Sequence, residues 1–220
     1  GSLLEFIAGN SPTTSYDNWL SHVSEGIVSP GFNDYGPEWL DIQTNGFGDH
    51  TILSENSPTL SYWETIFNRF VDGDTSFVDS LLTDSIQSFF YELVIFNDTT
   101  LNKTFHLLRE QLDTSYIDYN IPEITSDDVV GGFRNGWGLF IINVSAEREQ
   151  ILIQVPHPCD DFIAPYIALD LFFETDAFGF MIAGAGREVA WNQIGDYSNS
   201  KSISDPSRYP HTVFQKFQDA

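Results

Sequence analysis

The densest group of reactive side chains follows an apolar run in the second half of the chain. The run Ile151–Val155 ends at a proline, and the residues after it include His157, Cys159, Asp160 and Asp161. An imidazole beside two carboxylates can bind a metal ion or transfer a proton, and a thiol can act as a nucleophile. These residue types at the end of an apolar run mark the segment as a candidate site.

Two later segments contribute side chains of the same kinds. They supply Arg187, Glu188, Asp205, Arg208 and His211, in the stretches GAGRE and SISDPSRYPH. An imidazole, a nearby carboxylate and a second, distant imidazole are the ligands of a catalytic zinc ion that keeps one position open for water. The planar guanidinium of Arg187 or Arg208 can bind a substrate carboxylate. Glu188 can accept the proton that an activated water releases.

The elements that must position these side chains have the pattern of a parallel sheet. WGLFIINV, QILIQV and AFGFMIA are short apolar runs that predict strands, and DFIAPYIALDLFFETD has the apolar spacing of a helix. Near-continuous apolar strands joined through a helix are typical of a parallel sheet that is buried on both faces. The carboxyl ends of neighbouring parallel strands lie at one edge, so we expect the loops after QILIQV and AFGFMIA to line one crevice.

The first half of the chain has a different composition. Up to about residue 58, Gly, Pro, Asn, Asp and Ser surround isolated aromatic residues, which is typical of turns and irregular segments. The stretches 62–70, 76–96 and 99–113 carry apolar residues at spacings of three and four, which predicts two or three amphipathic helices. Asp74 and Asp98 are the expected N-caps.

These patterns predict one α/β domain over residues 1–220. Residues 1–125 form its helical and irregular portion, and residues 126–220 form the β-α-β portion that carries the site. The expected architecture is a three-layer α/β/α arrangement around a mostly parallel sheet.

Charge excludes several classes of partner. The chain has 9 Lys and Arg against 32 Asp and Glu, a formal net charge of −23, so its field repels nucleic acids and anionic lipid surfaces. No apolar run approaches the roughly 20 residues that span a bilayer. The acidic composition favours a secreted or periplasmic protein, and the initial Gly-Ser is typical of a cloning remnant, so we expect a native signal peptide to have been removed. The sequence does not define an oligomeric state.

The segments HPCDD, AGAGRE and DPSRYPH resemble those of the zinc-dependent amidohydrolases and carboxypeptidases that include N-formylglutamate amidohydrolase. The resemblance covers about residues 148–215. It implies a three-layer α/β fold, a zinc ion and hydrolysis of an amide or peptide-like substrate that bears a carboxylate. By position it implies His157 as the first zinc ligand, Asp160 or Asp161 as the acidic ligand, His211 as the distal ligand and Arg187 as the substrate clamp.

Two other functions are compatible with the same residues. One is a non-enzymatic extracellular binding or surface module, in which the histidines, aspartates and arginines form a structural ion-pair cluster. The other is a hydrolase that uses Cys159, the single cysteine, as its nucleophile. A single cysteine also excludes an internal disulfide bond. Asp160 or Asp161 can equally cap the helix that follows them.

Overall fold

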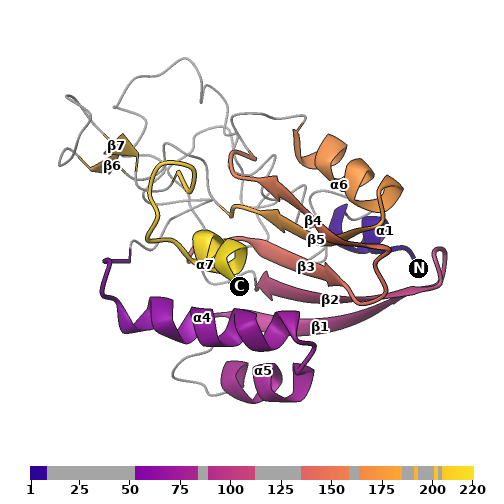
Figure 1. Cartoon of the computed structure of the whole chain (residues 1–220), viewed down its shortest axis with the longest axis horizontal. Coiled ribbons are helices and arrows are strands. Elements are labelled where there is room, and N and C mark those ends of the chain that lie inside the picture. Colours follow the sequence, from indigo (N-terminus) through magenta and orange to yellow (C-terminus); the bar gives the residue numbers. More distant parts are fainter. Residues whose placement is uncertain are drawn as a thin grey trace, which may run out of the picture.

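A five-stranded sheet with helices packed against it forms the centre of the molecule (Figure 1). The structure is a computed structural model, and it describes residues 1–8, 53–83, 89–111, 135–158, 164–184, 191–192, 201–202 and 205–220. The described residues combine helices with a mixed sheet, so the chain is of the α/β class.

The sheet has the strand order β1-β2-β3-β5-β4. Its strands are β1 (Tyr91–Asp98), β2 (Lys103–Glu110), β3 (Leu139–Asn143), β4 (Arg148–Val155) and β5 (Ala177–Ile182). β4 and β5 pair in parallel, whereas the other three pairings are antiparallel. The described strands therefore do not form the mostly parallel sheet that the sequence predicts. The short strands β6 (Trp191–Asn192) and β7 (Lys201–Ser202) form a separate antiparallel pair.

The hairpin β1–β2 lies where the sequence predicts helices, so that prediction is wrong for residues 91–110. Residues 1–125 therefore contribute two strands in addition to helices. The apolar side chains of β1 pack on both faces of the sheet, with Val94 and Phe96 on one core and Leu93 on the other. Burial on both faces removes the simple alternation of a strand and leaves spacings that resemble a helix. Asp98 caps the hairpin turn instead of a helix, because its Oδ1 accepts from the backbone N–H groups of Thr100 and Leu101.

The β-α-β unit of the second half is confirmed. Helix α6 (Ala164–Glu174) connects β4 to β5, and the two strands pair in parallel from Leu152↔Gly179 to Val155↔Ile182. The apolar runs and the helical spacing are local signals, and local signals are what a sequence pattern reports well.

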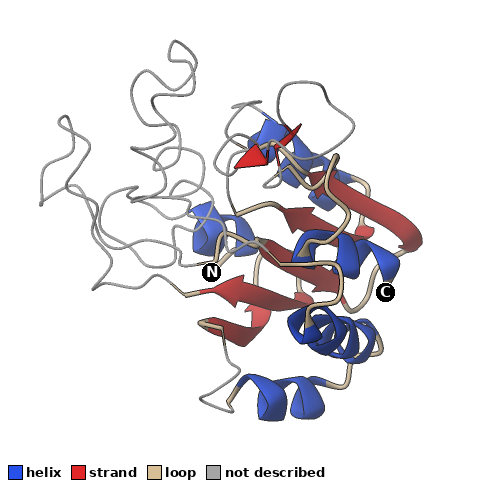
Figure 2. Ribbon diagram, turned by 90° about the vertical axis from the view of Figure 1, so that its left-hand side faces the viewer, coloured by secondary structure: helices blue, strands red, loops and turns tan. Residues whose placement is uncertain are grey.

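Helices pack on both faces of the sheet (Figure 2). Helices α1 (Leu3–Ala8) and α6 bury Leu3, Ile7 and Phe172 against one face. Helices α4 (Pro58–Val71), α5 (Thr75–Leu82) and α7 (Val213–Asp219) cover the other face. The predicted N-cap Asp74 is confirmed, since its side chain accepts from the backbone N–H of Phe77. No helix within the described ranges is long and apolar enough to cross a bilayer.

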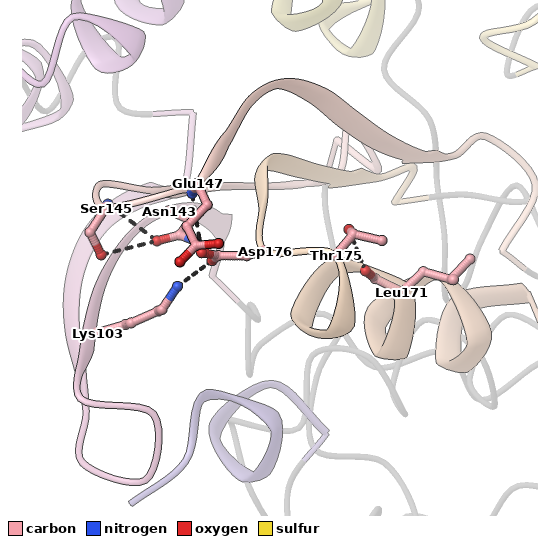
Figure 3. A network of polar contacts seen from close by, with 7 residues as sticks. All are labelled: Lys103, Asn143, Ser145, Glu147, Leu171, Thr175 and Asp176. Atoms are coloured by element: carbon pink, nitrogen blue, oxygen red, sulfur yellow. Dashed lines mark hydrogen bonds and ion pairs between the residues drawn. The ribbon is translucent and has the colours of Figure 1, made fainter.

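A hub around Asp176 fixes the start of the parallel pair (Figure 3). The Asp176 carboxylate accepts from Lys103 Nζ, from Asn143 Nδ2 at 2.6 Å and from the backbone N–H of Glu147 at 3.1 Å. Its carbonyl accepts from the N–H of Arg148, the first residue of β4. Asp176 thus joins β2, β3 and the β3–β4 turn at the point where β4 and β5 begin.

Candidate functional site

The carboxyl ends of β4 and β5 lie side by side. Val155 pairs with Ile182, and the N–H of Ala183 donates to the carbonyl of Val155 at 2.9 Å. The strands that precede residues 156–163 and 184–190 therefore end at the same side of the sheet, as the sequence predicts. Five of the predicted site residues or alternatives lie outside the described residues: Cys159, Asp160, Asp161, Arg187 and Glu188.

His157 lies two residues beyond β4 and contacts a segment 48 residues later in the chain. Its Nε2 lies 2.8 Å from Asp205 Oδ1 and 3.2 Å from Ser207 Oγ. An ionised carboxylate can only accept, so Nε2 carries the proton and donates to Asp205. In the neutral imidazole this places the ring lone pair on Nδ1. The structure thus joins two of the three predicted loops through one carboxylate–imidazole contact.

Asp205 is fully buried, and it is the residue that organises this contact. Its Oδ1 also accepts from the backbone N–H of Ser207 at 2.9 Å and from Ser207 Oγ at 2.6 Å. Arg208 Nε lies 3.4 Å from Oδ2, which is an ion-pair distance. Burial alone raises the pKa of Asp205, but the hydrogen bonds from His157 and Ser207 outweigh it and hold the pKa below its usual value. Asp205 is therefore a carboxylate in the folded protein at neutral pH.

This geometry differs from a catalytic serine triad. In such a triad the histidine contacts the carboxylate and the serine through different ring nitrogens. Here Asp205 and Ser207 both contact Nε2, and the short Ser207 Oγ–Asp205 contact shows that the hydroxyl hydrogen is directed at the carboxylate. Ser207 therefore supports Asp205 and is not activated by His157.

The other two described candidates lie on the same segment as Asp205. Arg208 is half-exposed and forms the ion pair with Asp205. His211 packs edge-on against the Tyr209 ring, with the ring centroids 5.2 Å apart. Within the described ranges, no three His, Cys, Asp or Glu side chains are grouped so that they could hold a metal ion. The predicted set of zinc ligands therefore requires Asp160 or Asp161 in addition to His157 and His211.

A buried glutamate at the same edge is a feature that the sequence analysis missed. Glu110 ends β2, and its two carboxylate oxygens accept from three successive backbone N–H groups, those of Asn135, Gly136 and Trp137. Burial raises the pKa of Glu110 to about 7, although these N–H groups favour the charged form and act in the opposite direction. A Gly-containing turn after a long connection was the one available signal, and it does not indicate which acceptor the turn uses.

Comparison with known proteins found no matching family model, no similar curated protein and no similar solved structure.

Proposed function

We propose that the protein is a zinc-dependent hydrolase that acts on an amide or peptide-like substrate bearing a carboxylate. The observation that carries this proposal is His157, held at the carboxyl end of β4 by the buried carboxylate of Asp205. Histidine ligands of metal ions commonly donate their other ring N–H to such a carboxylate, which fixes the tautomer and makes the ring more basic. Asp205 gives His157 this arrangement.

In this proposal His157 binds zinc with Asp160 or Asp161 and His211. The ion, when bound, supplies a Lewis acid and lowers the pKa of a water molecule. Asp205 orients the imidazole, Glu188 accepts a proton, and Arg187 or Arg208 binds the substrate carboxylate. The strongly acidic chain repels anionic substrates at long range, so these arginines must provide the selectivity locally.

The proposal includes the three-layer α/β/α arrangement expected of these hydrolases and a secreted or periplasmic location. Helices on both faces of the sheet support the first, although the antiparallel strands β1, β2 and β3 depart from a mostly parallel sheet. The acidic composition supports the second.

Metal content tests the proposal directly. Protein purified without chelator should contain about one zinc ion per chain, His157→Ala should lose it, and Asp205→Asn should bind zinc about 10–100-fold more weakly. Asp176→Asn is the matched control, because it changes a partly buried aspartate at the opposite edge of the sheet and should retain zinc. A folded protein that stays metal-free after zinc titration contradicts the proposal. Cleavage of N-acyl amino acids by the zinc-loaded protein then tests the substrate class.

The second candidate function is a non-enzymatic module, and one observation favours it. Asp205 receives His157, Ser207 and Arg208 together, so the cluster can serve only to tie the segment before α7 to the end of β4. In that case His157→Ala lowers stability, and wild-type protein binds no zinc stoichiometrically. The same set of variants therefore separates the two functions.

A further inference from the structure

The turn Asn135–Gly138, just before β3, lies beside Gly184 and beside the segment that follows Asp205. β3 runs antiparallel to β5, so its first residues lie beside the last residues of β5. A Cβ on Gly184 would come within 2.7 Å of the Gly136 carbonyl carbon and 2.8 Å of the Gly138 nitrogen. Backbone packs directly on backbone here, and Gly184 precedes the segment of the sequence that contains Arg187 and Glu188.

The same turn borders the segment that holds Asp205. A small pocket joins them, and it is lined by Gly136, Trp137, Ala183, Pro206, Thr212, Val213 and Phe214. Trp137, Ala183, Val213 and Phe214 also belong to one buried apolar cluster. The turn is therefore packed against Gly184 and against the chain that follows Asp205.

Glu110 holds this turn in place. The side chain of Glu110 is buried, and its oxygens lie 2.6 Å from the nitrogen of Asn135 and 3.0 Å from that of Gly136. Two further hydrogen bonds hold the turn: Asn135 Nδ2 donates to the carbonyl of Phe89 at 2.7 Å, and the Tyr91 hydroxyl donates to the carbonyl of Gly138 at 2.7 Å. Three consecutive N–H groups of the turn thus donate to one carboxylate.

We infer that Glu110 is a positioning residue for the candidate site, because its carboxylate orders the turn that packs on Gly184 and borders the segment holding Asp205. The inference rests on the proposed function only in that the carboxyl ends of β4 and β5 are taken as the hydrolase site. The packing relation between Glu110, the turn and the segment 205–214 is a separate claim and can be tested without any activity.

Protonation of Glu110 should weaken its hydrogen bonds to the backbone N–H groups of the turn. Neutral Glu110 has one hydroxyl in place of an acceptor oxygen, so it can no longer receive all three N–H groups as a carboxylate does. With a pKa of about 7, the change falls near neutral pH. Tyr91, directly opposite on β1, is the titratable group that faces Glu110 in the described chain. In the adjoining segment Asp205 is charged, and it is paired with His157 and Arg208.

Hydrogen exchange of metal-free protein tests the inference. Glu110→Ala should speed amide exchange roughly tenfold or more in residues 135–138 and 205–214, while α6 on the other face of the sheet keeps its protection. Glu110→Gln keeps one acceptor oxygen, so it should show a smaller increase. Protection factors, which compare each exchange rate with the intrinsic rate at the same pH, should fall with protonation of Glu110 in both segments of wild type and should not change with pH in Glu110→Gln. Glu92→Gln, on the neighbouring strand and paired with Arg109, is the matched control and should leave both segments unchanged.

Three results would overturn the inference. They are an effect confined to residues 135–138, a uniform rise in exchange over the described chain including α6, and a pH dependence of the protection factors in 205–214 that persists in Glu110→Gln. Since Glu110→Gln is nearly isosteric, it provides the decisive measurement if Glu110→Ala does not fold. Zinc content is measured separately, so absence of zinc with a positive exchange result contradicts the proposed function and leaves the positioning role of Glu110 established.

Discussion

Two aspartates hold the opposite edges of the parallel pair β4–β5, and they differ in their partners. Asp176, at the edge where β4 and β5 begin, receives the ammonium of Lys103, the amide of Asn143 and a backbone N–H. Asp205, at the edge where the strands end, receives the imidazole of His157. In both cases burial alone raises the pKa of the aspartate, and the hydrogen bonds outweigh it and lower the pKa.

The difference lies in what the donors can do. An ammonium, an amide and a backbone N–H keep the same protons throughout the neutral range, so the Asp176 hub has one state. An imidazole can gain or lose a proton, or bind a metal ion, within that range. The contacts of Asp176 are therefore structural, whereas the Asp205–His157 contact at the carboxyl ends of β4 and β5 is the candidate for chemistry.

The largest effect is expected from Asp176→Ala, which should lower the free energy of unfolding by about 3 kcal/mol. The variant leaves the Asn143 amide and the Glu147 N–H without their acceptor, and it places alanine at a positive φ of 50°. Urea unfolding measures the loss. Asp176→Asn tolerates this φ and should lose less. If both variants lose the same free energy of unfolding, the positive φ at position 176 does not contribute to the loss in Asp176→Ala.

Asp205→Asn should come next, with a loss of about 2 kcal/mol at neutral pH, because it weakens a buried charge-assisted contact with His157. Since the pKa of Asp205 is lowered in the folded protein, its charge stabilises the fold above the unfolded value of 3.8, and this contribution is lost as the pH falls through the folded pKa. The variant should therefore show a flatter decline in stability below pH 4. The same decline in stability below pH 4 in Asp205→Asn as in wild type would contradict the assigned charge of Asp205.

Ser207→Ala should cost about 1 kcal/mol, the usual contribution of one hydrogen bond. It removes the hydroxyl that donates to Asp205 and leaves the contact with His157 in place. Zinc content and any hydrolytic activity should persist. Abolished activity in a fully folded, zinc-loaded variant would instead identify Ser207 as a nucleophile and contradict the interpretation that it only supports Asp205.

Arg208→Gln should have the smallest effect on stability, about 0.5 kcal/mol or less, because exposed ion pairs contribute little. If Arg208 binds the substrate carboxylate, KM should rise for substrates that carry one and stay constant for their amides. Lys216→Gln is the control, since it removes another partly exposed ion pair on α7. An equal rise in KM for both substrate types would exclude Arg208 as the carboxylate clamp.

The sequence predicted those parts of the molecule whose signals are local. The runs that form β3, β4 and β5, the spacing of α6 and the cap at Asp74 all lie within a few residues of the structure they specify. The hairpin β1–β2 was missed because its side chains are shared between two cores, which hides the alternation of a strand. The roles of Asp205 and Glu110 were missed because their partners lie 48 and 25–27 residues away, and no local pattern identifies such partners.

The packing of α7 on α4 has a consequence for the order of events during synthesis. Phe67 and Phe70 of α4 are buried in part by Phe217 of α7, which is translated long after them. A nascent chain that ends anywhere between the two helices leaves this aromatic surface without its native cover, and such surfaces promote association with other chains. Chains arrested before α7 should therefore require chaperone protection until α7 has left the ribosome.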